Sequence, residues 1–320
     1  VFGKCFDFWD PKSLEEFSRL DGHTKCSEVT AQAAGWAIDI LNSYQQQIHN
    51  SARSISPKKL NRYEGFILDL DGTLWLGEEP IPGALETARA LAEMKNGVVI
   101  LTNNTALTRA EISRTLNESG LYIPEDRILT SAYITAKFLL KAYGKSLIYL
   151  IGNESFEEEL TRLGHKIVAF DKANIVVIGY DPDLNYEKLY RGMQALQKGA
   201  ILIASDLTPT WTGKSGILHP GSAAVVGSFA GMGFYPYAVV GKPSPIAVEM
   251  ALEYLGLPKS RECLLIGDDL EVDIKAAFNA GIDSLLVFTG VTQLEDLSKS
   301  FIKPDYVASS MAQLPVEARD

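Results

Sequence analysis

The sequence predicts an α/β fold built on a parallel sheet, chiefly because two kinds of segment alternate along most of the chain. From Tyr63 onward, short apolar runs rich in β-branched residues are each followed by a stretch with helical spacing of apolar residues. Strands that alternate with helices form parallel sheets covered on both faces. The length of 320 residues adds that about two domains are present, at roughly 100–200 residues per domain.

Composition is the third observation, and it excludes several classes of protein. Hydrophobic residues make up 46% and charged residues 22%, which argues against disordered, collagen-like and disulfide-scaffold chains. The formal net charge is −10, so the chain lacks the basic surface of a nucleic-acid-binding protein. The three cysteines form no CxxC or Cys/His cluster, and a zinc site is therefore not expected.

Cysteine usage also bears on location. Three cysteines cannot close a disulfide framework, which favours a reducing, intracellular compartment. We expect the cytoplasm or the mitochondrial matrix, because a start at Val1 suggests processing or trimming. The uncharged stretch 215–241 holds Pro220 and Pro236, which favours a buried helix, a turn and a short strand over a membrane helix. No membrane contact is expected.

Residues 1–60 are predicted to form a helical extension and a linker. Apolar side chains have helical spacing at Leu14, Phe17 and Leu20, and again at Ala34, Ala37, Ile38 and Leu41. The following stretch, 45–62, is polar and basic, as linkers often are. Exposed apolar stripes usually mark a contact surface, so we expect the extension to support a homodimer or a larger assembly.

The alternating part of the chain contains eight predicted strands and nine predicted helices. The strands are expected at 66–68, 98–101, 147–151, 175–178, 201–204, 238–240, 264–266 and 285–288. The helices are expected near 83–95, 106–118, 131–142, 154–163, 186–197, 220–230, 244–255, 271–280 and 293–299. Parallel sheets of this kind carry their sites at the carboxyl ends of the strands. The residues that follow each strand are therefore the candidates for function.

Two carboxylates follow the first strand, in the segment 69–73, which reads DLDGT. Residues two apart on a strand point to the same side, so Asp69 and Asp71 can share one site. Gly72 permits a sharp exit of the backbone. Close carboxylates repel unless a cation or a shared proton lies between them. An Asp-rich solvated turn is the simpler interpretation, but the apolar strand that leads straight into the segment favours function.

Polar groups also follow three later strands. The segment 102–104, Thr-Asn-Asn, can donate to an anion or cap the next helix. Lys242 follows the sixth strand and, standing alone, would be an ordinary surface lysine. Asp268, Asp269 and Asp273 follow the seventh strand. One of them can cap a helix, but capping does not account for all three.

Taken together, these side chains predict a phosphoryl-transfer site that contains a metal ion. Carboxylates gathered at one edge of a sheet are hard oxygen ligands of the kind that suits Mg²⁺. Lys242 and Thr102 would then face an anion that bridges to the metal. A metal ion and a lysine can neutralise phosphoryl oxygens while a carboxylate attacks phosphorus.

The order of these motifs resembles the haloacid dehalogenase-like (HAD) phosphatase superfamily. The chain has DxDGT at 69–73, Thr-Asn at 102–103, a lysine at 242 and GDxxxxD at 267–273. Further matches at 74–77, 81–84 and 289–291 are similar to the 4-nitrophenylphosphatase and phosphoglycolate phosphatase group, which carries a large α/β cap. The resemblance covers about residues 63–315, and four motifs in this order are specific.

The resemblance implies a Rossmann-like parallel-sheet core into which an α/β cap domain is inserted. We therefore expect a helical extension and linker at 1–60 and the first part of the core at 61–145. The cap is expected at 146–236 and the second part of the core at 237–320.

The resemblance also implies catalytic roles. Asp69 would be the nucleophile that forms an aspartyl-phosphate, and Asp71 would protonate the leaving group and then activate water. Thr102 and Lys242 would bind the phosphoryl oxygens, with Asn103 beside them at the substrate.

The metal site is implied in the same way. The Asp69 carboxylate, the Asp71 backbone carbonyl and the Asp268 carboxylate would hold Mg²⁺. Asp273 would support the metal or the lysine from behind. Relatives often carry Arg or Asn where this chain has Asp269, so an extra negative charge next to the site is a departure from the family.

A cap loop selects the substrate in the family, and the corresponding segment here is 205–216, continuing to His219. Asp206, Thr208 and Trp211 are the expected substrate-binding residues. Relatives usually carry Asn where this chain has Asp206. Packing is the alternative role for Trp211, and the start of a helix is the alternative for His219.

The sequence thus predicts a Mg²⁺-dependent phosphatase of small phosphomonoesters, with an aspartyl-phosphate intermediate. Two alternatives stay open. The chain could be a HAD-fold subunit with a structural role, docked into an assembly through residues 1–60. It could also transfer the phosphoryl group to an acceptor other than water, which would use the same residues.

Overall fold

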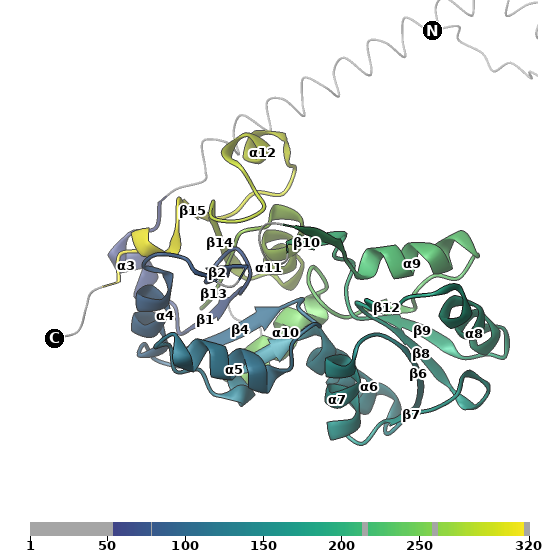
Figure 1. Ribbon diagram of the computed structural model, residues 1–320. Helices are drawn as coiled ribbons and strands as arrows, with labels where there is room; N and C mark the ends of the chain where they lie inside the picture. The colour runs from purple at the N-terminus through teal and green to yellow at the C-terminus, as the bar shows by residue number, and fades with distance from the viewer. Residues whose placement is uncertain (1–53, 78, 213–216, 258–261, 317–320) are drawn as a thin grey trace, which may run out of the picture. The chain divides into compact units, whose positions relative to one another are not determined.

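Two parallel sheets organise the protein, as its computed structural model shows (Figure 1). The structure describes residues 54–77, 79–212, 217–257 and 262–316. The predicted helical extension lies outside these residues, except for its last segment. Among the described residues, no helix is both long and apolar enough to cross a membrane.

The first sheet has six strands and the second has five, and all pairings within them are parallel. The six strands, in spatial order, are β15 (Tyr306–Ala308), β14 (Asp283–Val287), β13 (Cys263–Gly267), β1 (Gly65–Leu68), β4 (Val98–Thr102) and β5 (Ile128–Thr130). The five strands are β12 (Ala238–Val239), β9 (Ile201–Ala204), β8 (Ile175–Ile178), β6 (Leu147–Ile151) and β7 (Lys166–Ile167). The predicted α/β class, with a parallel sheet and a second α/β layer, is confirmed.

Helices follow most strands along the chain. They are α3 (Pro57–Leu60), α4 (Ala84–Ala92), α5 (Arg109–Glu118), α6 (Ser131–Tyr143), α7 (Glu154–Arg162), α8 (Tyr186–Gln197), α9 (Ser222–Gly231), α10 (Pro245–Leu255), α11 (Lys275–Ala280) and α12 (Leu294–Lys299). The short 3₁₀ turns are η1 (Glu125–Arg127), η2 (Phe170–Lys172) and η5 (Met311–Gln313), and η4 (Leu270–Ile274) is a π-helix. Two antiparallel hairpins complete the described elements: β2 (Trp75–Leu76) with β3 (Glu79–Pro80), and β10 (Thr210–Thr212) with β11 (Leu218–Pro220).

All eight predicted strands and nine predicted helices are present; β6, β8, β9 and α8 have the predicted bounds, and the others have shifted ends. The helix predicted from 106 begins at Arg109, because Thr108 and Glu111 form a reciprocal capping box. The helix predicted from 271 begins as the π-helix η4 and continues as α11. Strands β5, β7 and β15 and the strands of the two hairpins have no predicted counterpart, since two or three residues are too few to show a periodic pattern.

Successive side chains of β1 point to opposite faces of the first sheet, and they are buried on both faces. Phe66 and Leu68 belong to one apolar cluster with residues of α4 and α5, and Ile67 belongs to another with residues of α6, α10 and α11. A strand buried on both faces reads as a continuous apolar run, which is what the sequence has at 65–68.

Strand β1 is the point at which the order of the first sheet reverses. The chain passes from β1 to β4 and β5 on one side, and it later fills the other side with β13, β14 and β15. Leu68, the last residue of β1, is paired with Ile100 of β4 and with Ile266 of β13, and the two neighbours continue to Thr102 and Gly267. Sites in open α/β sheets lie at such a reversal point.

Two observations bear on the expected boundaries without testing them. Ile55 and Leu60 are 7% and 0% exposed and belong to a core cluster, so residues 54–60 are packed rather than a free linker. β12 pairs with β9, which carries the five-stranded sheet to Val239, beyond the cap end expected at 236. The division into core and cap stays a prediction.

A buried ion pair connects α5 to α7. Arg109 Nε lies 3.1 Å from Glu159 Oε1, and the Arg109 backbone N–H donates to the same oxygen. The guanidinium also lies 3.6 Å from the ring centroid of Tyr133. Close by, Ser155 Oγ donates to the carbonyl of Ala106 at 3.0 Å. The layer of the second sheet is therefore tied to the start of α5 by charge as well as by apolar contact.

We expect Glu159→Gln to destabilise the fold by about 3 kcal/mol, because it leaves the buried Arg109 guanidinium with only the partly exposed carboxylate of Glu125. The matched control is Glu158→Gln, whose side chain is exposed and pairs with Arg162 along the same helix. The control should cost less than about 0.5 kcal/mol. Urea unfolding measures both values, and equal losses would contradict the importance of the buried pair.

Candidate active site

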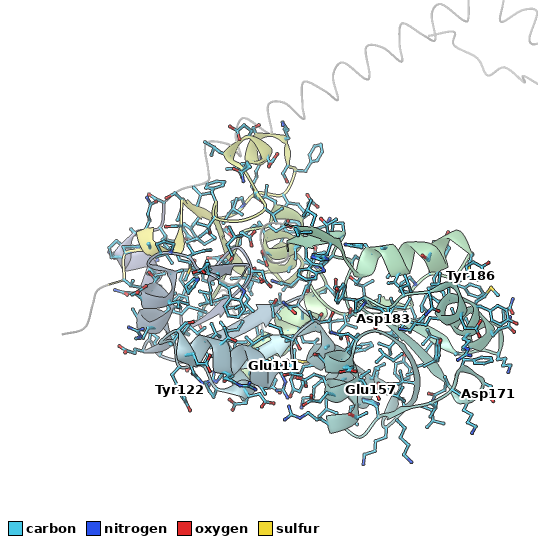
Figure 2. The ribbon with its side chains drawn as sticks, viewed as in Figure 1. Glu111, Tyr122, Glu157, Asp171, Asp183 and Tyr186 are labelled. Carbon is cyan, nitrogen blue, oxygen red and sulfur yellow. The ribbon has the colours of Figure 1, made fainter. Side chains whose placement is uncertain are left out.

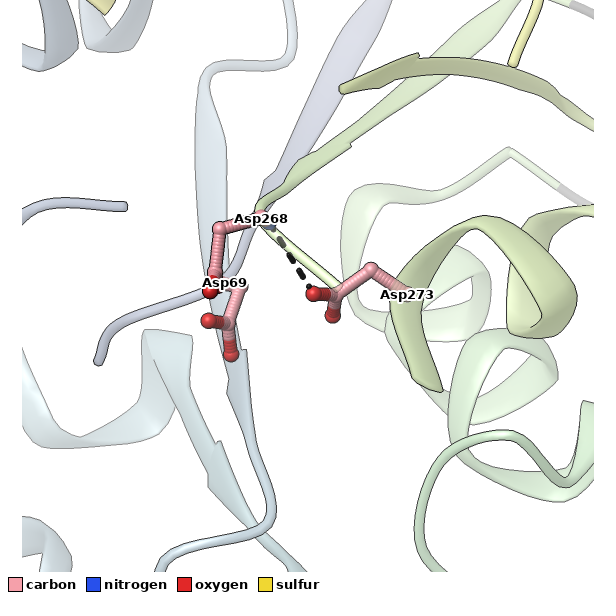
Figure 3. Close-up of side chains that lie close together, drawn as sticks. All are labelled: Asp69, Asp268 and Asp273. Atoms are coloured by element: carbon pink, nitrogen blue, oxygen red, sulfur yellow. Dashed lines mark hydrogen bonds between the residues drawn. The ribbon is translucent and has the colours of Figure 1, made fainter. Parts of the chain in front are cut away.

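The carboxyl ends of β1 and β13, together with the π-helix η4, bring three acidic side chains together (Figure 3). Carboxylate oxygens of Asp69, Asp268 and Asp273 lie within 4.8 Å of one another, and all three residues are buried. Asp69 follows β1 directly, and its N–H donates to the carbonyl of Ile266 on β13 at 2.9 Å. The order of the sheet at β1 thus creates the cluster.

Lys242 supplies a positive charge inside this cluster. Its Nζ donates to Asp69 Oδ1 at 2.5 Å and to Asp273 Oδ1 at 2.6 Å, and the residue is only 2% exposed. Burial alone would lower the pKa of Lys242, but the charges of Asp273 and Asp69 outweigh it and raise that pKa. The lysine is therefore a firmly charged ammonium, not the surface residue that it would be if it stood alone.

The amide of Asn103 fixes the backbone of that lysine. Asn103 Oδ1 accepts from Lys242 N at 2.9 Å, and Asn103 Nδ2 donates to Lys242 O at 2.9 Å. Ser131 Oγ in turn donates to the Asn103 carbonyl at 3.0 Å. The side chain that sequence reasoning expected at the substrate thus holds the lysine in position. Next to it, Thr102 is buried at the end of β4, and its hydroxyl accepts from Asn104 N.

Asp273 uses both carboxylate oxygens within the protein. Oδ1 binds Lys242, and Oδ2 accepts from the backbone N–H groups of Asp268 and Asp269 at 3.2 and 3.1 Å; Figure 3 marks the first of these. Asp269 instead caps η4, because its Oδ1 accepts from the N–H groups of Glu271 and Val272. The structure brings Asp273 to the lysine and gives Asp269 a capping role.

Asp268 is enclosed by two glycine loops. Its Oδ2 accepts from Val291 N at 2.6 Å, and Thr73 Oγ1 lies 3.5 Å from its Oδ1. Gly72 has φ +88°, and a Cβ atom there would lie 2.5 Å from the Asp268 carboxylate. At Gly290, which has no positive φ, a Cβ atom would lie 2.0 Å from Asp268 Oδ2. Only glycine allows the backbone to approach the carboxylate this closely, which explains the glycine in each loop.

Asp71 differs from Asp69 in being exposed to solvent. Trp75 Nε1 donates to its Oδ1 at 2.8 Å, and Asn104 Nδ2 lies 3.4 Å from its Oδ2. The two carboxylates that the sequence places two residues apart therefore have different environments. Asp69 is enclosed with the lysine, and Asp71 stands at the open side of the site.

Burial raises the pKa of each clustered carboxyl group. For Asp69, burial outweighs the lowering effect of Lys242, and the pKa is raised. For Asp268, burial and the nearby charges of Asp69 and Asp273 raise the pKa well above its usual value. For Asp273, burial and then the Asp69 charge raise the pKa to about 6. Three carboxylates around one ammonium are an unfavourable balance that a divalent cation would correct.

The expected cap-loop residues lie at the end of β9 and in the β10–β11 hairpin. Asp206 is buried, and it accepts from the hydroxyl groups of Ser205 and Ser222 and from the N–H of Thr208. Its carboxylate therefore holds the loop together. A Cβ atom on Gly241 would lie 3.1 Å from Asp206 Cβ, so the loop begins next to the segment that carries the lysine.

Trp211 is part of an aromatic group in that hairpin. Its ring stacks on His219 with centroids 4.6 Å apart, and the ring of Tyr180 meets it edge-on at 5.4 Å. Trp211 is partly exposed, so one part of the indole is packed and another part faces solvent. Packing and substrate contact, the two roles considered for this residue, are thus compatible.

Sequence reasoning did not assign a role to several groups at the site. Four groups bond to the loop after β1 or to Asp268. The side chains of Trp75 and Asn104 donate to Asp71, the Thr289 hydroxyl donates to the carbonyl of Gly72, and the Val291 N–H donates to Asp268. Trp75 and Val291 lie in segments that matched the family, but nothing in a pattern of letters indicates which atom a side chain bonds. A tryptophan four residues after an acidic strand end was the available signal.

The chain is similar to several known proteins. A family model for haloacid dehalogenase-like hydrolases matches residues 66–166, and a second, HAD-hydrolase-like model matches residues 239–314. An acid sugar phosphatase of Staphylococcus haemolyticus is 30% identical over 247 residues, which are 77% of this chain and 93% of that protein. A 5'-nucleotidase of Bacillus subtilis is 31% identical over 255 residues, covering 79% of this chain and 98% of that protein.

A solved structure shows that the similarity extends to the fold. The crystal structure of 4-nitrophenylphosphatase from Thermotoga maritima has a TM-score of 0.75 and 35% identity, covering 81% of this chain and 99% of that one. All three organisms are bacteria, so these relatives give no support to the mitochondrial matrix that the start at Val1 suggested.

A parallel α/β core with buried carboxylates and a lysine at one sheet edge defines a class of hydrolases. This chain belongs to the haloacid dehalogenase-like hydrolases, within their 4-nitrophenylphosphatase-like group, and it is a phosphomonoester hydrolase.

The raised pKa of the carboxyl cluster predicts a pH-dependent effect of metal on stability. Asp69 and Asp268 both have folded-state pKa values raised above their unfolded values, chiefly by burial. Their protonation therefore stabilises the folded state at low pH, and this contribution is lost as the pH rises through the raised pKa values. A divalent cation that replaces those protons should raise Tm more at about pH 7.5 than at about pH 5.

Thermal unfolding in EDTA and in excess Mg²⁺, at both pH values, measures this difference. A cation at a hundredfold excess over its Kd adds about 2.7 kcal/mol. Asp268→Asn should reduce the metal-induced shift in Tm. Asp183→Asn, at an exposed residue between β8 and α8, should leave that shift unchanged. Equal shifts at the two pH values would contradict the pKa argument.

Proposed function

We propose that the protein hydrolyses small phosphomonoesters with the help of Mg²⁺, through an aspartyl-phosphate on Asp69. The observation that carries the proposal is the ammonium of Lys242, which touches Asp69 at 2.5 Å within a buried group of carboxylates. The Asp69 carboxylate can therefore attack a phosphorus atom while the Lys242 ammonium binds oxygens of the same phosphoryl group.

The first half-reaction transfers the phosphoryl group to the protein. An oxygen of Asp69 forms a bond to phosphorus while the bond to the ester oxygen breaks. Lys242 and the Thr102 hydroxyl bind the phosphoryl oxygens, and Asp71 gives its proton to the departing alkoxide, which leaves as an alcohol. The exposed position of Asp71 supports this role, because the leaving group must depart toward solvent.

The second half-reaction returns Asp69 to its starting state. Asp71, now a carboxylate, accepts a proton from water as the water oxygen attacks phosphorus. The acyl-phosphate bond breaks, and inorganic phosphate leaves. One carboxyl group thus acts as acid and then as base, which needs no further titratable group.

The carboxylates fit a hard divalent cation. Asp69 and Asp268 would hold it with the backbone carbonyl of Asp71, since both oxygens of Asp273 are already engaged by Lys242 and by backbone N–H groups. Oxygen donors without nitrogen or sulfur are the set that Mg²⁺ prefers. When bound, the cation would neutralise charge on the phosphoryl oxygens.

The substrate class follows from relatives and from the hairpin. The similar proteins are a sugar phosphatase, a 5'-nucleotidase and a 4-nitrophenylphosphatase, which supports a small phosphorylated metabolite as substrate. We propose that Trp211, positioned by the loop that Asp206 and Thr208 anchor, contacts the group that carries the phosphate. The alternative of a purely structural HAD-fold subunit is not favoured by these relatives. Assembly through residues 1–60 stays a prediction.

Asp69→Asn should lower kcat by at least about a thousandfold, because an amide does not attack phosphorus. The fold should remain, as judged by Tm in EDTA. Rapid acid quench of the unmodified enzyme should trap a phosphoryl group on Asp69. Turnover of the Asn variant near the normal rate would refute the proposed intermediate. The control is Asp171→Asn, at an exposed residue of the 3₁₀ turn η2, which should leave kcat unchanged (Figure 2).

Trp211→Ala should change the ranking of substrates more than it changes the rate on 4-nitrophenyl phosphate. We expect the ratio of kcat/KM for a nucleoside monophosphate over a sugar phosphate to shift about tenfold. Tyr186→Ala removes an aromatic ring that is 85% exposed at the start of α8 (Figure 2), and it should leave the ratio unchanged. A uniform fall across all substrates would show that the indole serves packing and not selection.

A further inference from the structure

We infer that Trp75 is a positioning residue for Asp71: its indole N–H holds one carboxylate oxygen, so that the other oxygen is presented to the leaving group. The inference deepens the proposed function and rests on it, because it takes Asp71 as the acid of the first half-reaction.

The geometry of the loop after β1 carries the inference. Trp75 Nε1 lies 2.8 Å from Asp71 Oδ1, and Asn104 Nδ2 approaches the other oxygen at 3.4 Å. The backbone of the loop is closed as well, since Gly72 N donates to Trp75 O at 2.7 Å and Trp75 N donates to Leu70 O at 3.2 Å. The indole is therefore held at a fixed distance from the carboxylate.

The two partners differ in mobility. Trp75 is 6% exposed and belongs to the apolar cluster that contains residues of α4, whereas Asp71 is exposed to solvent. An exposed aspartate would sample several side-chain rotamers if nothing held it. Packing fixes the rotamer of the buried indole. Its hydrogen bond to Asp71 therefore restricts the rotamers of the exposed carboxylate.

The chemistry of the donor decides which oxygen is presented. An indole nitrogen only donates hydrogen bonds, so Oδ1 is kept as an acceptor. Asn104 Nδ2 is also a donor, but its contact with Oδ2 is long at 3.4 Å, against 2.8 Å for the indole contact with Oδ1. Oδ2 is therefore the oxygen that is left to carry the proton for the leaving group. A general acid accelerates the reaction only when its proton lies within hydrogen-bond distance of the departing oxygen, so its orientation affects the rate.

A plainer role is possible for the same bond, since a buried Trp N–H usually finds some acceptor. The two roles differ in one measurable property, which is the dependence of rate on the leaving group. Esters of alcohols need a proton at the departing oxygen, and esters of acidic phenols need it much less. Loss of a purely structural contact would lower all rates alike.

The test replaces the N–H and keeps the ring. Trp75 is changed to Phe, and separately to 3-benzothienylalanine, in which sulfur takes the place of the indole N–H at nearly the same volume. For each variant, kcat/KM is measured on phosphate monoesters from 4-nitrophenyl phosphate to glycerol phosphate, in excess Mg²⁺. This parameter covers the steps up to departure of the leaving group.

We expect kcat/KM on the alkyl ester to fall at least about tenfold and on 4-nitrophenyl phosphate less than about threefold. The matched control is Tyr63→Phe, which also removes a buried aromatic donor from an aspartate: Tyr63 Oη donates to Asp283 Oδ2 at 2.7 Å at the other end of the strands. The control should leave the dependence on the leaving group unchanged. An equal fall on all esters in the benzothienyl variant would overturn the inference.

A second series separates this inference from the function on which it rests. Asp71→Asn alone should steepen the dependence on the leaving group, and adding the benzothienyl change should steepen it no further, because the acid is already gone. If Asp71→Asn leaves the dependence unchanged, the proposed role of Asp71 fails. If Asp71→Asn steepens it and the Trp75 variant does not, only the positioning role fails.

Discussion

The buried ammonium of Lys242, shared between Asp69 and Asp273, is the interaction on which the rest of the site depends. Each carboxylate would be costly to bury alone, and together they would repel. The lysine makes their burial tolerable, and it joins the end of β1 to η4, which follows β13. Neighbouring features follow from it: the Asn103 clamp on its backbone, and the two N–H groups that occupy the far oxygen of Asp273.

This arrangement divides the acidic side chains by task. Asp273 is committed to holding the lysine, and Asp269 is committed to the start of η4. Asp69 and Asp268 remain to meet a cation, and Asp71 faces solvent with its own hydrogen-bond donors. Five carboxylates that look alike in the sequence thus have distinct environments. The environment of each one is set by the strand or turn that carries it.

Much of this could be predicted from the sequence. The strands and helices are periodic over enough residues to be recognised, and the strand ends identify the polar groups that meet at β1. What could not be predicted depends on individual atoms. The amide of Asn103 bonds both polar groups of the Lys242 backbone, and two serine hydroxyls donate to the Asp206 carboxylate. No pattern of residues indicates these contacts, and the expected substrate contacts of Asn103 and Asp206 stay predictions. Residues 54–60 read as a polar linker because only Ile55 and Leu60 among them are apolar and buried.

The clamp between Asn103 and Lys242 joins positions that are 139 residues apart, and all five strands of the second sheet lie between them. The catalytic edge cannot be complete until the chain has returned from that excursion, so it has the character of a late, long-range contact in folding. The entropy cost of such a closure grows only with the logarithm of loop length, about 0.6 kcal/mol for each doubling. Lengthening or shortening the intervening layer therefore changes the cost of assembling the edge very little. Evolution can vary the part of the chain that meets the substrate without dismantling the part that breaks the phosphate ester.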